Sequence, residues 1–180
     1  TALDIVRHHA DADREHIRDL ISGNYCRCTG YQAIVDAIGE NKAAIRLSPT
    51  NVYNNITHSN PIAQFTHLIE HLNEMPLSYL HLMNVPYPAE QFPHYPKNVI
   101  EDLGKLSKHL VMANCGYNQE TGEAELQKGI AQMISYGVLF LANPDLPQRF
   151  ENNAPLNAPD RATMYSGGDQ GYIDYPFMHA

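Results

Sequence analysis

The chain has 180 residues, a formal net charge of −8 and 12 lysines and arginines. That length is enough for one domain with a sizeable core, or for one domain with a small appendage. Because the few basic residues form no cluster, we expect no binding to nucleic acid or to an anionic membrane surface. The longest nearly apolar run, 133–142, is too short to cross a bilayer, and the first 20 residues lack an apolar signal core. We therefore expect a cytoplasmic protein.

The residues before Gly39 predict helices and no strand. Helices are expected near 2–9, 14–22 and 31–38, and a turn containing Cys26 and Cys28 separates the last two. Cysteines one residue apart are more typical of metal or redox chemistry than of disulfide scaffolds. The boundary is expected near Gly39, which divides the chain into a helical segment, 1–38, and a second region, 39–180.

The second region alternates strand-like and helix-like segments, a pattern typical of βα units around a parallel sheet. Strands are predicted at 43–47, 77–83, 110–113 and 133–136. The first helix is expected to begin at Ser59 or Asn60 as N-cap, with Pro61 in its first turn. Further helices are predicted near 98–108 and 119–128, and a short last one is predicted with Asn143 as its cap and Pro144 at its first position. These elements make four βα units.

Several segments of this region carry a specific resemblance. They are, in chain order, IRLSPT, PIAQFTHLIEHLN, YLHLM, VMANCGY, FLANPDLPQRF and LNAPDRATMYSGGDQGYIDYP. Over 39–180 the chain resembles the C-terminal half of the old yellow enzyme family, the FMN-dependent ene-reductases that include N-ethylmaleimide reductase-like proteins. The family fold is a (β/α)8 barrel. The resemblance therefore implies an α/β fold in which half of a TIM barrel, four βα units, follows a short all-helical segment.

The first 38 residues resemble a different family. The line TALDIVRHHADADREHIRDLISGNYCRCTGYQAIVDAI is similar to the C-terminal part of the 2Fe-2S domain of xanthine and carbon monoxide dehydrogenase small subunits. This resemblance implies that Cys26 and Cys28 are two of four thiolate ligands, the other two lying in an upstream Cys-x-x-Cys turn. A cluster is thus expected only where a dimer brings two such pairs together. The alternatives are a disulfide, a zinc site or two cysteines without a ligand. We interpret the chain as a chimera of two fragments.

The old yellow enzyme resemblance also implies where FMN binds. The family holds the flavin phosphate with the backbone after its seventh and eighth strands. The matching residues here are Asn114, Cys115 and Gly116 in one loop and Gly137 and Val138 in the other. Val138 stands where the family has an arginine that pairs with the phosphate, and Cys115 stands where a small residue is usual. Loss of the arginine is expected to weaken FMN binding by ~1.5–3 kcal/mol.

The same resemblance suggests residues for the flavin ring and the substrate. Arg46 matches an arginine that lies against the flavin ring, and Tyr165 matches an aromatic residue near the substrate. Tyr165 and His81 are the candidate catalytic residues. The alternatives are that Arg46 binds nearby carbonyls and that Tyr165 packs against the core or the surface. The implied activity is NAD(P)H-dependent reduction of activated alkenes or quinones. A competent monomer is not expected, because the family's substrate-binding and proton-donating residues come from the first four units.

An open four-stranded parallel sheet has two unpaired edges and an uncovered inner face. We expect a homodimer in which two half-barrels close into an eight-stranded pseudo-barrel. A small-molecule pocket is expected at its mouth. In the alternative arrangement, the N-terminal helices cover the exposed edge.

A promiscuous or metal-dependent hydrolase that uses a new pocket at the homodimer interface is a further alternative. The segment 67–71 fits H-x-x-E-H, in which His67 and His71 share one helix face and Glu70 activates a metal-bound water. Zinc at this site needs a third ligand, and the plainer interpretation is an ordinary outer helix. The remaining alternative is a non-catalytic chimera that is stable as an oligomer.

Overall fold

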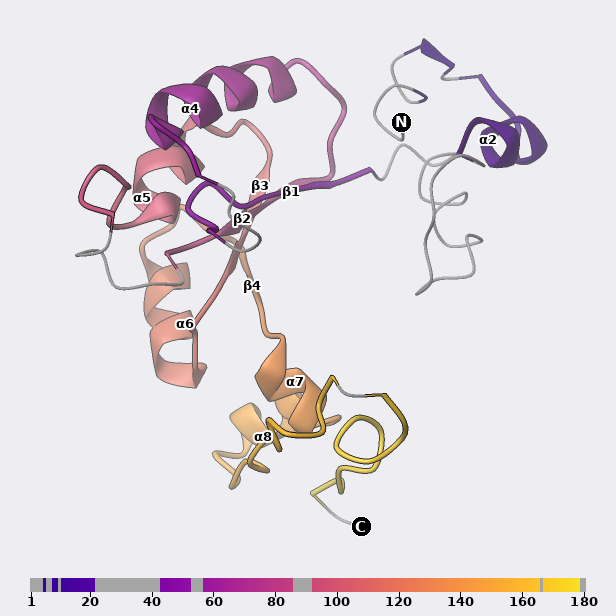
Figure 1. Cartoon of the computed structure of the whole chain (residues 1–180), viewed down its shortest axis with the longest axis vertical. Coiled ribbons are helices and arrows are strands. Elements are labelled where there is room, and N and C mark those ends of the chain that lie inside the picture. Colours follow the sequence, from indigo (N-terminus) through magenta and orange to yellow (C-terminus); the bar gives the residue numbers. More distant parts are fainter. Residues whose placement is uncertain are drawn as a thin grey trace.

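Four parallel strands form the sheet in the upper half of Figure 1. They are β1 (Ile45–Leu47), β2 (Tyr79–Met83), β3 (Leu110–Asn114) and β4 (Met133–Ser135), and they pair in chain order. This computed structural model describes residues 5, 8–9, 11–21, 43–52, 57–85, 92–165 and 167–178. The strands lie within a few residues of their predicted positions. The parallel order confirms the predicted α/β fold.

The first helix of the α/β region begins where the sequence predicts. This helix, α4 (Pro61–Leu72), has Asn60 as its N-cap, and the Asn60 side chain accepts a hydrogen bond from the Ala63 amide at 3.1 Å. The predicted helix near 98–108 is shorter, because α5 (Val99–Leu103) passes into the 3-10 turn η3 (Gly104–Leu106). A β-carbon on Gly104 would lie 3.0 Å from the Ile130 side chain, so the close approach of this turn favours glycine.

Helix α6 (Gln119–Gln127) lies within the predicted range, and a capping box with Asn118 and Thr121 starts it. The prediction for the end of the region is wrong in part. Helix α7 (Val138–Ala142) was not predicted, and α8 (Leu146–Glu151) has Asp145 rather than Asn143 as its N-cap. The Asn143 side chain cannot cap α8, because it donates to the Leu139 carbonyl at 2.9 Å and accepts from the Asn157 amide at 2.7 Å.

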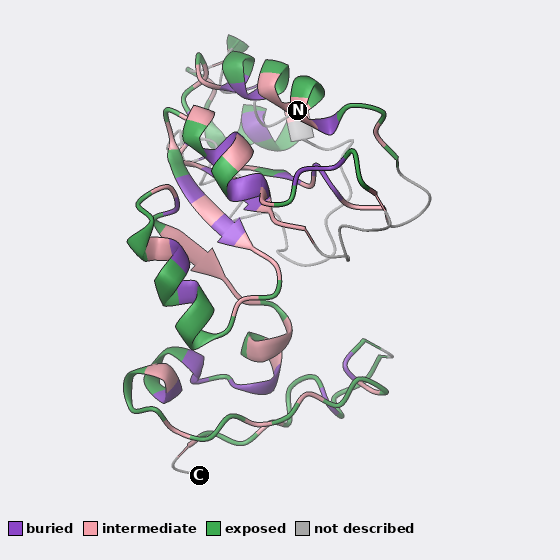
Figure 2. Ribbon diagram, turned by 90° about the vertical axis from the view of Figure 1, so that its left-hand side faces the viewer, coloured by how far each residue is buried: buried purple, intermediate pink, exposed green. Residues whose placement is uncertain are grey.

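Buried and less buried residues alternate along β2 and β3 (Figure 2). Alternate strand residues point to opposite faces. One set packs against α4 and α5 in a continuous apolar core. Its fully buried members include Leu80, Leu82, Val111 and Ala113 from the strands and Ile69, Val99, Ile100 and Leu103 from the helices. The other set, on the inner face, is only half-buried in β2 and consists of Tyr79, His81 and Met83.

A buried ion pair holds the C-terminal segment, 155–178, against α8. The Nε of Arg149 donates to Asp145 at 2.6 Å, and its two terminal nitrogens donate to the Pro155 and Pro176 carbonyls at 2.6 and 2.9 Å. The other carboxylate oxygen of Asp145 accepts from the Met178 amide. Burial alone would raise the pKa of Asp145, but Arg149 and the backbone donors outweigh it and hold the pKa below its usual value. This clamp brings residues 159–165 to the strand ends.

Little of the N-terminal region is described. Helix α2 (Arg14–Ile21) agrees with the helix predicted at 14–22, and the His9 amide donates to the Ile5 carbonyl within the first predicted helix. Cys26, Cys28, the predicted helix at 31–38 and the boundary near Gly39 lie outside the described residues, so the division into two domains stays a prediction. In the part of the chain that the structure describes, every helix is too short or too polar to cross a membrane.

Candidate functional site

A cavity of about 680 Å³ lies at the carboxyl ends of the strands. This is where parallel α/β folds bind their ligands, and the size is within the ~300–1,000 Å³ typical of small-molecule sites. The lining residues predicted from the sequence are Arg46, Asn114, Cys115, Gly116, Gly137, Val138 and Tyr165. The structure therefore brings all the predicted cofactor-binding residues, and one of the two predicted catalytic residues, into a single cavity.

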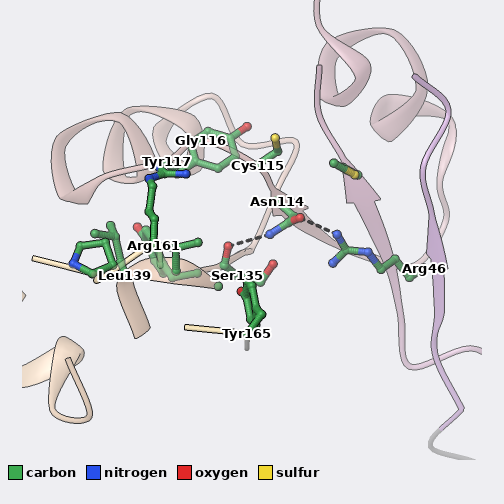
Figure 3. Close-up of a pocket in the computed structure, with 14 residues that line it drawn as sticks. Arg46, Asn114, Cys115, Gly116, Tyr117, Ser135, Leu139, Arg161 and Tyr165 are labelled. Carbon is green, nitrogen blue, oxygen red and sulfur yellow. Dashed lines mark hydrogen bonds between the residues drawn. The ribbon is translucent and has the colours of Figure 1, made fainter. Parts of the chain in front are cut away.

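A hydrogen-bond network fixes the Arg46 guanidinium (Figure 3). One terminal nitrogen donates to the Asn114 side-chain oxygen at 2.7 Å, and the other contacts His81 Nε2 at 2.9 Å. The Asn114 amide in turn donates to the Ser135 carbonyl at 3.0 Å. These contacts differ from the expected alternative in which Arg46 binds strand carbonyls, because both acceptors of Arg46 are side chains.

The network also fixes the state of His81. A guanidinium can only donate, so Nε2 of His81 accepts from Arg46, and the proton of the neutral ring lies on Nδ1. Ser135 Oγ lies 2.9 Å from the same Nε2. Burial and the neighbouring Arg46 charge lower the pKa of His81, so the ring is neutral at pH 7. His81 does not line the cavity. Its role is to accept a hydrogen bond from Arg46, which does line the cavity.

The two loops of the cavity expose their backbone. Cys115 and Gly116 follow β3 with φ angles of 95° and 76°, in the left-handed region that favours glycine. A β-carbon on Gly116 or Gly137 would have no atom within 4 Å, so open space lies beside both backbones. Burial raises the pKa of the Cys115 thiol, although Arg46 opposes this. A ligand can therefore approach the loop backbone closely at the two glycines, and Cys115 also lines the cavity.

The structure adds residues that the sequence did not indicate. Those that line the cavity are Met83, Tyr117, Ser135, Tyr136, Leu139, Pro159 and Arg161. Arg161 belongs to the segment LNAPDRATMYSGG, which the family resemblance includes without giving this residue a role. A signal was available, since Arg161 is a basic residue in a loop segment four positions before Tyr165, and loops carry many binding residues.

The predicted zinc site finds no support in the geometry. The rings of His67 and His71 lie 4.3 Å apart, but Nδ1 of His71 is 2.9 Å from the His67 carbonyl oxygen and is engaged there. In the described ranges no group of three or more His, Cys, Asp or Glu residues could hold a metal. Within the described ranges, His67 and His71 therefore have no third ligand for zinc, and the hydrolase alternative is not supported.

Two family models match the chain. Residues 31–157 match the NADH:flavin oxidoreductase / NADH oxidase family, and residues 1–39 match a 2Fe-2S binding domain. Both matches agree with the resemblances found in the sequence.

Plant proteins are among the similar relatives. A putative 12-oxophytodienoate reductase 11 of Oryza sativa subsp. japonica is 39% identical over 152 residues, which is 82% of this chain and 40% of the relative. A 12-oxophytodienoate reductase-like protein of Solanum lycopersicum is 37% identical over 148 residues, 82% of this chain and 39% of the relative. The chain thus spans about 40% of the length of the relatives it matches.

Solved structures give the same result. The old yellow enzyme from Trypanosoma cruzi superposes with a TM-score of 0.71 at 28% identity, covering 81% of this chain and 38% of that one. Morphinone reductase superposes with a TM-score of 0.69 at 33% identity, covering 81% and 40%. The four βα units therefore correspond to part of a TIM barrel.

Proposed function

The chain belongs to the NADH:flavin oxidoreductase / NADH oxidase family, and on this basis we propose that its cavity binds FMN and serves NAD(P)H-dependent reduction of an activated alkene or quinone. The main support is the cavity at the strand ends, where a fixed guanidinium and two open glycine backbones line one space. When bound, FMN would accept a hydride from the nicotinamide and pass it to the electron-poor substrate.

The residues present fit such a cofactor. Gly116 and Gly137 leave their backbones open to a ligand, as a phosphate-binding loop requires. Arg46 supplies a fixed positive charge, which stabilises a ligand that gains negative charge. Asn114 and His81 hold that charge in place. Tyr165 is 73% exposed at the mouth and is available to contact the substrate.

We propose that FMN binding is weak. Val138 brings no charge to the second loop, and Cys115 occupies space beside the first. Both departures lie in the two loops that would hold the FMN phosphate, whereas Arg46, which would lie against the flavin ring, matches the family.

An FMN titration of purified protein of known native mass tests the assignment. We expect the flavin absorption bands to shift on binding, and we expect Arg46→Ala to weaken the binding. A protein that binds would then be assayed for NADH or NADPH consumption with an enone or a quinone. An unchanged FMN spectrum at protein and flavin concentrations of about 1 mM contradicts the proposal and leaves a non-catalytic chimera.

The inner face suggests an assembly. Leu110, at the start of β3, is 53% exposed although it is a large apolar residue. We propose that a second copy packs against this face and that native mass measurement gives a dimer. The Cys26 and Cys28 pairs of two copies would then supply the four thiolates of a cluster. A broad reddish absorption would reveal it.

A further inference from the structure

The cavity contains two guanidinium groups whose surroundings differ. Arg46 is committed to acceptors within the protein, since it donates to Asn114 and contacts His81. Arg161 lines the same cavity, and in the part of the chain that the structure describes it has neither a hydrogen-bond acceptor nor an ion-pair partner. Figure 3 shows the two on opposite sides of Asn114 and Ser135. Arg161 is thus the guanidinium that is available to a ligand.

The nearest carboxylate in sequence does not neutralise Arg161. One oxygen of Asp160 accepts from the Ala162 amide at 2.9 Å, and the other accepts from the Thr163 hydroxyl at 2.9 Å. The Asp160 amide donates to the Tyr175 hydroxyl at 2.7 Å. These bonds close a local turn that fixes the backbone next to Arg161, and among the described residues Asp160 makes no ion pair with Arg161. The positive charge is therefore left for another partner.

The charge balance of the cavity favours an anion. Among the described residues that line it there is no aspartate or glutamate, although the whole chain carries a net charge of −8. An unpaired guanidinium in a cavity free of carboxylates binds phosphate well, since its planar fork can donate two parallel hydrogen bonds. The same cavity offers the open backbones of Gly116 and Gly137.

We propose that Arg161 binds the phosphate of FMN and so supplies, from the C-terminal segment, the positive charge that Val138 does not. This inference rests on the proposed FMN function. It assigns one part of FMN to each end of the cavity. Arg46 faces the flavin ring, and Arg161 faces the phosphate. The C-terminal segment is then part of the cofactor site as well as of the substrate mouth.

Comparing FMN with riboflavin tests this assignment, because riboflavin lacks the phosphate. Dissociation constants for both flavins are measured by quenching of flavin fluorescence in the native protein, Arg161→Gln and Lys105→Gln. The last variant removes one exposed positive charge from η3, outside the cavity. We expect Arg161→Gln to raise the FMN constant about 10-fold or more, with no change for riboflavin, and we expect Lys105→Gln to change neither.

The double variant Arg161→Gln with Val138→Arg is expected to recover the preference for FMN over riboflavin. If FMN binds the native protein and Arg161→Gln leaves its constant unchanged, or weakens both flavins equally, Arg161 does not bind the phosphate and the FMN function still stands. If neither flavin binds the native protein, both the function and the role of Arg161 are wrong.

Discussion

The two faces of the same strands differ in function: one stabilises the fold, and the other carries the polar groups of the site. Leu80 and Leu82 of β2 point to the helix-covered face and are 1% and 0% exposed, whereas His81, between them, points to the inner face and binds Arg46. In β3, Val111 and Ala113 are buried in the core, and Asn114 turns the other way into the cavity. Burial of apolar surface makes the helix-covered face the main source of stability. The inner face supplies polar groups and so the chemistry.

The largest expected effect tests the helix-covered face. Leu82→Ala removes a fully buried side chain from the core and is expected to lower the free energy of unfolding by ~3 kcal/mol. Met83→Ala, at the next position on the inner face, is the matched control and is expected to lower it by much less. Urea unfolding measures both. Equal losses would show that the two faces contribute alike to stability.

The second prediction concerns the inner face. Arg46→Met removes the charge and both side-chain contacts, and it is expected to raise the FMN dissociation constant about 10-fold or more while the free energy of unfolding changes by less than ~1 kcal/mol. Arg46→Lys keeps the charge without the planar fork, so its FMN dissociation constant is expected to lie between those of the native protein and Arg46→Met. A large loss of stability with unchanged flavin binding would assign Arg46 to the scaffold instead.

The third prediction concerns a strained loop residue of the cavity. Cys115 has a φ of 95°, which disfavours any side chain with a β-carbon. Cys115→Gly is expected to be more stable than Cys115→Ala by about 1 kcal/mol, since both variants remove the thiol but only glycine releases the strain. Thermal unfolding measures this difference. Both variants also remove the thiol from the cavity lining, so a tighter FMN complex is expected in each; unchanged affinity would mean that the thiol does not crowd the ligand.

The smallest expected effect is a pH dependence at His81. Because burial and Arg46 lower its pKa, the unfolded chain takes up this proton at a higher pH than the folded chain does. The contribution of His81 to stability is therefore complete above its usual pKa of about 6.5 and declines as the pH falls below it. Protonation also removes the acceptor of Arg46, so flavin affinity is expected to fall in the same range. His81→Gln should flatten the pH profiles of both the free energy of unfolding and the flavin affinity. His94→Gln changes an exposed residue outside the cavity and should leave both profiles as they are. Parallel profiles in all proteins would exclude His81 as the titrating group.

Local patterns explain what the sequence could predict. Alternation in β2 and β3 and the Asn60-Pro61 start of α4 depend on neighbouring residues alone, so strands, helix and parallel order followed from them. Residues at strand ends, such as Asn114 and Gly137, meet at one edge of any parallel sheet. The family resemblance then indicated which of them belong to a flavin site.

Contacts between distant residues could not be predicted in this way. Asn143 has the sequence of a helix cap, but its side chain binds Asn157, 14 positions away. His81 faces Arg46 through the register of two strands, which the sequence alone does not fix. Arg161 lines the cavity in a segment that Arg149 and Asn157 hold through bonds to residues distant in the sequence.

Because of the clamp at Arg149, the C-terminal segment and the sheet are held by different sets of contacts and can change independently in evolution. The segment carrying Arg161 and Tyr165 is fastened by polar contacts at Asp145, Arg149 and Asn157, while the sheet is held by its own apolar core. Residues 159–165 lie between the anchors at Asn157 and Pro176 and are not part of the apolar core of the sheet, so exposed positions among them can change at the mouth of the cavity while that core stays the same. New ligand preferences can therefore arise in the C-terminal segment of this scaffold while the fold stays the same.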